Sequence, residues 1–217
     1  MKLVIGNKNY SSWSLRPWLL LEHFAIPFEE VRIPLYTPES RPVLLAHSPS
    51  GKVPALVDGA ITIWDSLAIC EYVAELDAAR GAWPAERATR ALARSVAAEM
   101  HSSFRTLREL MPMNVRGRDR HVASTDALRE DIARVQQIWT TCRERPGRAD
   151  GPWLFGSFTV ADAMFAPVAC RFQTYGVACD GVAGEYLATL LEHPAMRRWA
   201  AAGELETEVV EGSEVGR

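Results

Sequence analysis

The chain has 217 residues, 48% of them hydrophobic, and is therefore long enough to bury a sizeable core in one or two domains. Its formal net charge of −3 excludes the overall basic character that attracts nucleic acid or an anionic membrane surface. No apolar run reaches membrane-spanning length, and segment 1–6 has the pattern of a first strand rather than of a secretory signal. The cysteines form no C-x-x-C pair and no histidine stands at ligand spacing from them, which indicates free thiols, no metal site and a cytoplasmic location; they are Cys70, Cys142, Cys170 and Cys179.

The first 80 residues alternate between strand and helix patterns. In chain order we expect a strand over 2–7, a helix over 14–25, a strand over 28–34, a short helix over 38–47, a hairpin over 54–64 and a helix over about 65–78. The hairpin is predicted because Asp58-Gly59 is a favoured two-residue turn between two apolar runs. This order predicts one α/β domain of the pattern βαβαββα.

Pro17 decides where we expect the first helix to begin. With Ser14 as the N-cap, the missing N–H of Pro17 falls in the first turn, where it has no helical partner anyway. With Ser11 as the cap, Pro17 would interrupt the hydrogen-bond ladder. We therefore predict that Ser11 and Ser12 lie in the loop just before the helix.

Beyond residue 80 the pattern is helical. Apolar residues recur every three or four positions from Leu92 to Met111 and again from Leu128 to Trp139, which predicts two long helices, and a buried-looking helix follows over 160–175. The tail from about residue 204 is acidic and poor in apolar residues, so we expect it to be loosely held. The histidines form no ligand or triad pattern and are expected to be surface or capping residues: His23, His47, His101, His121 and His193.

The segment Ser11-Ser12-Trp13-Ser14 is the first candidate site. A helix N-terminus attracts anions through its free N–H groups and the helix dipole. A hydroxyl at that position can also donate a hydrogen bond to a thiolate. The alternative is that these serines are only helix caps, a position that serine favours.

The second candidate site is Lys52-Val53-Pro54. A cis bond before Pro54 would leave the N–H and C=O of Val53 free to pair with an extended peptide, as an added strand would. Lys52 would then meet a carboxylate. The alternatives are an ordinary proline at the start of a strand and a solvated surface lysine.

Asp65-Ser66 is the third candidate site and opens the helix that follows the hairpin. A ligand with both an amine and a carboxylate suits this pair. Asp65 can hold the amine, while the Ser66 hydroxyl and neighbouring N–H groups can hold the carboxylate.

Together these motifs resemble the cytosolic glutathione transferase superfamily over essentially the whole chain. S-S-W-S-L-R, S-G-K-V-P-A-L and D-S-L-A-I stand in the family's order and at nearly its spacing. The first is most similar to the S-S-C-S pattern of the serine-type zeta class, from which it differs at Trp13. Serines at positions 11 and 14, where glutaredoxins have cysteines, disfavour thiol–disulfide chemistry.

The resemblance implies a fold and a domain division. We expect a thioredoxin-like glutathione-binding domain over 1–79, a linker over 80–85 and an all-α domain over 86–217 that forms the electrophile pocket. Thr159 and Asp162 match the family's capping box, to which we assign a role in folding.

The resemblance also implies glutathione as co-substrate and a set of site residues. It assigns the thiolate-stabilising hydroxyl to Ser11, with Ser12 as a close rival. The glutathione ligands that carry over are Lys52, Val53, Pro54, Asp65 and Ser66. The candidate electrophile-binding residues are Trp13, Met111, Asn114, Arg171 and Tyr175.

The function that the resemblance implies is conjugation of glutathione to small, partly apolar electrophiles, by a twofold homodimer with no metal, nucleic-acid or membrane partner. Two alternatives stay open. One is a glutathione-dependent cis–trans isomerase of the maleylacetoacetate type, and the other is a non-catalytic binding or regulatory protein with the same fold.

Overall fold

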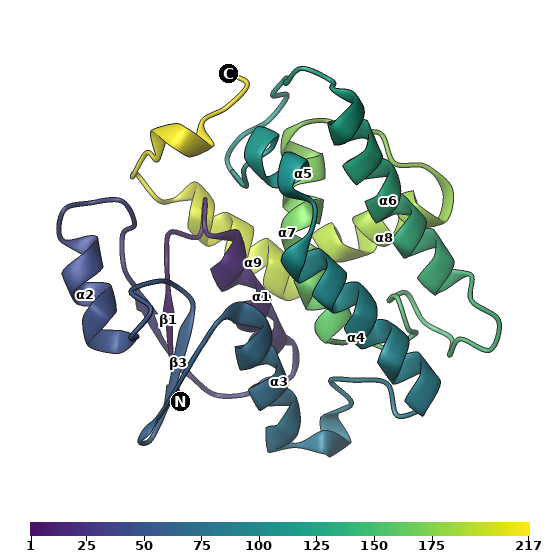
Figure 1. Cartoon of the computed structure of the whole chain (residues 1–217), viewed down its shortest axis with the longest axis horizontal. Coiled ribbons are helices and arrows are strands. Elements are labelled where there is room, and N and C mark those ends of the chain that lie inside the picture. Colours follow the sequence, from purple (N-terminus) through teal and green to yellow (C-terminus); the bar gives the residue numbers. More distant parts are fainter.

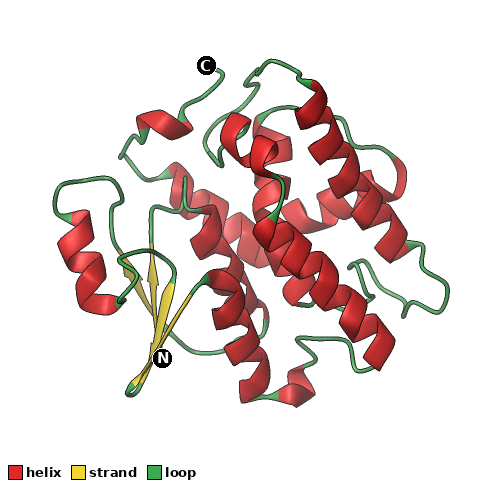
Figure 2. Cartoon of the chain, viewed as in Figure 1, coloured by secondary structure: helices red, strands yellow, loops and turns green.

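The computed structural model describes residues 1–217, arranged as a small sheet with flanking helices beside a larger helical unit (Figures 1 and 2). The sheet contains β1 (Lys2–Ile5), β2 (Glu29–Arg32), β3 (Ala55–Asp58) and β4 (Ile61–Trp64), in the order β2-β1-β3-β4. β2 runs parallel to β1, whereas β3 is antiparallel to both β1 and β4. This is the predicted thioredoxin-like arrangement.

Helices cover both faces of the sheet, because successive side chains of a strand point to opposite faces. Helix α2 (Ser40–His47) covers one face, where its Leu44 packs with Val4 and Ile33. Helices α1 (Ser12–His23) and α3 (Ser66–Leu76) pack against each other on the other side. Figure 1 shows α2 separated from these two helices by the strands.

The rest of the chain is helical, as predicted. Its elements are the short 3₁₀ turn Ala78–Arg80, α4 (Arg87–Ser102), α5 (Arg105–Leu110), α6 (Asp126–Arg143), α7 (Val160–Thr174), α8 (Gly181–Glu192), α9 (Pro194–Glu204) and a 3₁₀ turn at Glu211–Ser213. The buried helix expected over 160–175 is confirmed as α7. Its capping box is present, with the Thr159 N–H donating to Asp162 Oδ2 at 2.8 Å.

A single cluster of 47 buried apolar residues runs through both units. Helix α1 packs directly on α7, and α4 packs on the same helix. The two units therefore share one core, which fixes the N-terminus of α1 against the helical unit. None of the helices has the length and apolar character needed to cross a bilayer.

Two local predictions are wrong. Helix α1 begins at Ser12 with Ser11 as its N-cap, so Pro17 lies inside the helix and Ser12 is a helical residue. The burial of Leu15 and of Trp18 to Leu21 outweighs the ladder bond that Pro17 removes. In the hairpin, Asp58 pairs with Ile61, which makes Gly59-Ala60 the two-residue turn.

The helix predicted from Leu92 to Met111 is also interrupted. Phe104 adopts a left-handed conformation with φ of 61° between α4 and α5, although it stays buried. Apolar periodicity continues across the break because both helices face the same core. Periodicity alone therefore does not reveal the change of direction.

The C-terminal tail is not loosely held. The Glu206 carboxylate accepts hydrogen bonds from the N–H groups of Lys8 and Asn9 at 2.7 and 3.0 Å. Farther along, the Glu214 carboxylate accepts from Tyr10 and Arg120. Acidic residues that look solvated in the sequence are thus the groups that attach the tail to the body of the protein.

Candidate active site

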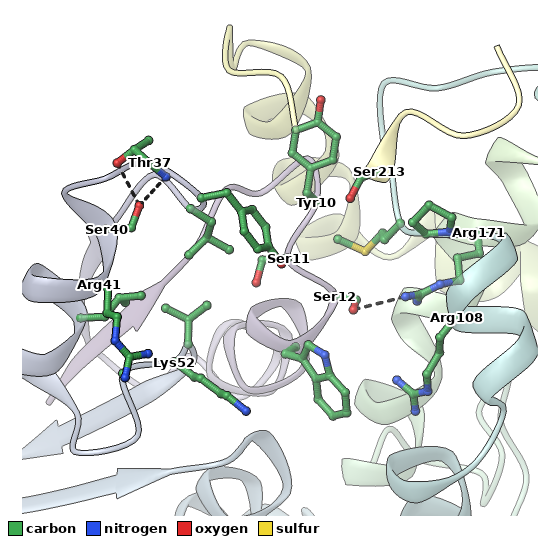
Figure 3. Close-up of a pocket in the computed structure, with 18 residues that line it drawn as sticks. Tyr10, Ser11, Ser12, Thr37, Ser40, Arg41, Lys52, Arg108, Arg171 and Ser213 are labelled. Atoms are coloured by element: carbon green, nitrogen blue, oxygen red, sulfur yellow. Dashed lines mark hydrogen bonds between the residues drawn. The ribbon is translucent and has the colours of Figure 1, made fainter. Parts of the chain in front are cut away.

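A cavity of about 560 Å³ opens at the N-terminus of α1, between the sheet unit and the helical unit (Figure 3). A second cavity, of about 510 Å³, shares Trp13, Lys52 and Val53 with it and extends to Asp65 and Ser66. We call them the main cavity and the side cavity. The three motifs predicted from the sequence therefore meet in one continuous depression.

Ser11 and Ser12 both line the main cavity and are 5% and 6% exposed, but their hydroxyls have different partners. The Ser11 hydroxyl donates to Ser14 Oγ at 2.7 Å, and Ser14 Oγ also accepts from the Gly6 N–H at 3.1 Å. Ser12 Oγ instead accepts a hydrogen bond from Arg171 Nη2 at 3.3 Å. The proton of Ser12 is therefore available to a ligand, whereas that of Ser11 is used within the protein.

Arg171 reaches the main cavity from α7 and is held in place by carbonyl groups. Its Nε donates to the Met111 carbonyl at 2.8 Å and its Nη1 to the Pro167 carbonyl at 3.2 Å. Burial, followed by the nearby charge of Arg108, lowers the pKa of Arg171 to about 10, so the guanidinium remains charged at neutral pH. Figure 3 shows Arg171 directed at Ser12 and Arg108 beside it.

Arg108 from α5 adds a second positive charge to the same wall. Its guanidinium lies 4.9 Å from the ring centroid of Trp13, within cation–π range. It donates to the carbonyls of Ser103, at 2.9 Å, and of His101, at 3.3 Å. Since neither Arg108 nor Arg171 donates to a carboxylate, this end of the main cavity is electropositive.

Lys52 and Val53 line the boundary between the two cavities. The Val53–Pro54 peptide bond is cis. Neither the N–H nor the C=O of Val53 has a backbone partner within the protein. An extended ligand lying along this edge can therefore form two main-chain hydrogen bonds.

Asp65 and Ser66 stand at the start of α3, at the far end of the side cavity. Asp65 is the N-cap, with Oδ1 accepting from the Leu67 N–H at 2.9 Å, and its Oδ2 lies 3.4 Å from Nε2 of His101. Ser66 is 1% exposed, and its Oγ accepts a hydrogen bond from Arg16 Nη1 at 3.2 Å. An acid and a hydroxyl thus face one cavity from adjacent positions.

Of the predicted electrophile-binding residues, Trp13 and Arg171 line the main cavity, whereas Met111, Asn114 and Tyr175 do not. Asn114 is fully buried and accepts a hydrogen bond from the Gly117 N–H, and the Tyr175 hydroxyl donates to the Pro112 carbonyl. These polar groups hold the loop after α5 in place. The break at Phe104 changes the direction of the chain, and Pro112 and Met113 form the cavity wall instead.

The sequence analysis missed several residues at the site, among them Arg108, His101, Tyr10 and Ser213. Tyr10 and Ser213 line the main cavity, and the Tyr10 hydroxyl is occupied, donating to Glu214 and accepting from Arg116 at 2.8 Å. His101 is not a simple surface residue, since it contacts both Asp65 and the Trp13 ring. The only sequence signal for Tyr10 was its position directly before Ser11.

The segment that carries these motifs matches a known protein family. Residues 10–76 match the model of the glutathione S-transferase N-terminal domain. This segment is thus similar to a glutathione S-transferase N-terminal domain. The match contains Ser11, Ser12, Lys52, Val53, Asp65 and Ser66, all of which line the two cavities.

Two curated proteins resemble parts of the chain. Dichloromethane dehalogenase of Methylorubrum extorquens is 40% identical over 60 residues, which cover 27% of this chain and 21% of that protein. Glutathione S-transferase F10 of Arabidopsis thaliana is 43% identical over 63 residues, 29% of either chain. The chain thus spans less than a third of the length of the curated relatives it matches.

Solved structures share the fold over the whole chain. A maleyl pyruvate isomerase, described as a bacterial glutathione S-transferase in the zeta class, superposes with a TM-score of 0.71, 22% identity and coverage of 96% of this chain and 100% of its own. A maleylacetoacetate isomerase from Methylobacterium extorquens AM1, with malonate and glutathione bound, gives a TM-score of 0.70, 22% identity and coverage of 97% and 100%. The entire chain therefore has the glutathione transferase fold, helical unit included.

Proposed function

We propose that this protein is a glutathione transferase of the serine type, which adds the glutathione thiolate to small, partly apolar electrophiles. The observation that carries the proposal is the pair Ser12–Arg171 in the main cavity, joined through Lys52 and Val53 to Asp65 and Ser66 in the side cavity. The order of these side chains along the two cavities matches a tripeptide that carries two carboxylates, an amine and a thiol.

Each ligand group has a partner of suitable chemistry. Asp65 holds the ligand's α-amine, and Ser66 with the free N–H groups at the start of α3 holds its α-carboxylate. Val53 pairs with the cysteinyl main chain, next to Pro54, and Lys52 attracts the terminal carboxylate. The thiol then lies at the N-terminus of α1, between the two serines.

The hydrogen-bond pattern favours Ser12 over Ser11 as the donor to the thiolate. Ser11 already donates to Ser14, whereas Ser12 only accepts, from a charged guanidinium. A free thiol has a pKa of about 8.5, so that about 3% is thiolate at pH 7, and lowering this pKa by about two units needs about 2.7 kcal/mol. A charge-assisted hydrogen bond of about 1.5–3 kcal/mol and a helix-end contribution of about 0.3–1 kcal/mol account for that amount.

A glutathione-dependent cis–trans isomerase is the second candidate, and the electropositive wall favours it. Arg108 and Arg171 face the main cavity without carboxylate partners, while Pro112 and Met113 supply an apolar surface beside them. A maleyl compound is an unsaturated acid and suits both features. In this reaction the thiolate adds to the double bond and is released again, so no glutathione is consumed.

Two further proposals concern the location and the oligomeric state of the protein. We propose a cytoplasmic twofold homodimer, which the resemblance to glutathione transferases supports. Light scattering measures the mass in solution, and a mass of one chain would contradict the dimer.

The third functional candidate is a non-catalytic binding or regulatory protein. Such a protein would not need residues that bind and activate a thiol, yet the serines, Lys52, Asp65 and Ser66 all line the cavities.

The test compares Ser12→Ala with Ser11→Ala, and uses Ser95→Ala on the exposed face of α4 as a control. Calorimetry measures glutathione binding, a chlorinated nitroarene measures conjugation, and a maleyl acid measures isomerisation. We expect Ser12→Ala to lower kcat by at least about tenfold and to move the pH profile upward, while glutathione affinity changes less than about threefold. Full conjugation by Ser12→Ala would refute its role, and no binding of glutathione by the wild-type protein would refute the function.

A further inference from the structure

Tyr36 is an exposed aromatic residue at the edge of the main cavity. It lies in the loop between β2 and α2, and it lines the cavity together with Ser11 and Leu35. The residue is 80% exposed. The hydroxyl groups of the other four tyrosines all make hydrogen bonds within the protein, whereas the hydroxyl of Tyr36 makes none. The folded chain therefore leaves this side chain available to a ligand.

The backbone of Tyr36 is strained. Its φ of 62° lies in the left-handed region, where the Cβ of an L-residue comes too close to the following carbonyl oxygen. Glycine and asparagine adopt this conformation more readily than a residue with a bulky side chain. Pro34 and Pro38 lie two residues away on either side and fix their own φ angles, so the loop has little freedom to relieve the strain.

Hydrogen bonds hold the loop on both sides of Tyr36. The Leu35 N–H donates to Oδ1 of the buried Asn7 at 2.8 Å. The Thr37 N–H donates to Oγ of the buried Ser40 at 2.9 Å. Neither bond involves the Tyr36 side chain, so the neighbouring residues impose its backbone conformation. The loop is thus a rigid support for an exposed ring.

Contacts within the protein do not offset this strain. An aromatic ring stabilises a fold by removing apolar surface from water, and a largely exposed ring removes little. Strained residues of this kind are concentrated at active sites and at sites that clamp a ligand. Trp13, a second ring of the same cavity, is also incompletely buried, at 37% exposure. The main cavity therefore offers two aromatic surfaces to a bound molecule.

We propose that Tyr36 is a specificity-determining residue that covers the electrophile in the main cavity and favours planar, conjugated compounds. This inference rests on the proposed function, which places glutathione along Lys52 and Val53 with its sulfur at the N-terminus of α1. The electrophile then occupies the remaining part of the main cavity, which Tyr36 lines.

The loop that carries Tyr36 stands on one side of the place assigned to the sulfur. Figure 3 shows Ser11 between this loop, marked by Thr37, and Arg171 on the opposite side. A flat conjugated ring on the sulfur can pack against the Tyr36 ring in the offset or edge-to-face arrangement that aromatic pairs prefer. A saturated alkyl group lacks such a face. Because the loop is already rigid, the contact costs little backbone entropy.

This arrangement predicts opposite effects of one substitution on folding and on binding. Tyr36→Asn removes the ring and supplies a residue that tolerates the left-handed conformation. We expect the Tm of the free protein to stay the same or to rise by about 1–4 °C. We expect a ligand with an aromatic ring on the sulfur to bind about 5- to 30-fold more weakly, because it loses the ring contact.

Three ligands separate a contact with the electrophile from a contact with glutathione. They are glutathione, S-methylglutathione and S-(2,4-dinitrophenyl)glutathione. The last is the product of the proposed reaction with a chlorinated nitroarene, in which the thiolate forms the carbon–sulfur bond and chloride leaves. Calorimetry measures the three dissociation constants for each protein, and differential scanning calorimetry measures the Tm without ligand.

We expect Tyr36→Asn to weaken only the binding of the dinitrophenyl conjugate and to leave the other two affinities within about threefold. Tyr36→Phe keeps the ring without the hydroxyl and should bind all three ligands within about threefold of the wild type. Ala25→Asn is the matched control, because Ala25 is exposed, has a φ of 50° and lies outside both cavities. It should leave the Tm unchanged or raise it, and it should change none of the affinities.

Three results would overturn the inference. One is wild-type affinity of Tyr36→Asn for the dinitrophenyl conjugate. Another is an equal loss of affinity for all three ligands, which would assign Tyr36 to glutathione or, with a lower Tm, to the fold. The third is a wild-type protein that binds the dinitrophenyl conjugate no more tightly than S-methylglutathione. A wild-type protein that binds none of the ligands would instead refute the proposed function, so the two failures are distinguishable.

Discussion

Acid should destabilise this protein through a pair of histidines packed between α1 and α9. His23 Nδ1 lies 2.9 Å from His193 Nε2, and His193 Nδ1 accepts a hydrogen bond from the Ala195 N–H at 3.1 Å. The second contact requires an unprotonated Nδ1, so His193 carries its proton on Nε2 and donates it to His23. The ring of Phe158 stacks on His23 at 4.0 Å and encloses the pair.

Protonation of either ring breaks this arrangement. A proton on His193 Nδ1 would face the Ala195 N–H, and a proton on His23 Nδ1 would face the His193 N–H. Burial, then the charges of His23 and Arg198, lower the pKa of His193 to about 4, and burial lowers the pKa of His23. Both histidines are therefore neutral in the folded protein at neutral pH.

The sign of the effect follows from the protons bound in each state. Below about pH 6.5 the unfolded chain protonates His193 and the folded chain does not, so stability falls as the pH is lowered. The fall begins near pH 6.5 and is complete below about pH 4. A difference of about 2.5 pH units corresponds to at most about 3 kcal/mol for His193.

His193→Asn tests this reasoning, because asparagine is a good N-cap and does not titrate. Urea unfolding is measured from about pH 4.5 to 7.5 for the wild type, His193→Asn and the exposed His121→Asn. We expect His193→Asn to flatten the acid limb of the stability curve by about 2–3 kcal/mol and His121→Asn to leave it unchanged. Parallel curves for the wild type and His193→Asn would refute the argument.

Two other substitutions test the role of buried carboxylates. Asp162→Ala leaves the Tyr186 hydroxyl and the Thr159 N–H at the start of α7 without acceptors. We expect the free energy of unfolding to fall by about 3–5 kcal/mol, which corresponds to a drop in Tm of about 10 °C or more. An unchanged Tm would contradict the capping role. Glu214→Gln weakens the contacts with Tyr10 and Arg120, so limited proteolysis should cleave the tail faster while the Tm of the body changes little. Equal cleavage rates would show that other contacts hold the tail.

The features that were predicted correctly depend on interactions between residues that are close together in the chain. The strands, the hairpin, the N-cap at Asp65 and the capping box at Thr159 depend on residues within a few positions of each other. The three candidate-site motifs are also short, and each lies where a strand or helix begins. Such features are visible in a sequence because their interactions do not depend on distant parts of the chain.

The start of α1 shows where local reasoning fails. Because Pro17 cannot donate a backbone hydrogen bond, the sequence predicts that the helix begins after Ser14. In an isolated helix the loss of that bond would determine where the helix begins. In the folded protein α1 is packed between α3 and α7, and the buried apolar side chains outweigh that bond. The consequence is functional, because Ser12 becomes a helical residue facing Arg171 instead of a loop residue.

Patterns within single segments predict the order of the elements and the places of Lys52 and Asp65 in it, because these features depend on neighbouring residues alone. Folding brings residues from four helices together around the cavities: Arg108 and Arg171 line the main cavity, while Arg16 and His101 contact Ser66 and Asp65 beside the side cavity. The physical reason is that an arginine on a helix looks the same in sequence whether it faces water or a site. Its role is decided by what packs around it, and here that is the N-terminus of α1 held against α7 by a shared core.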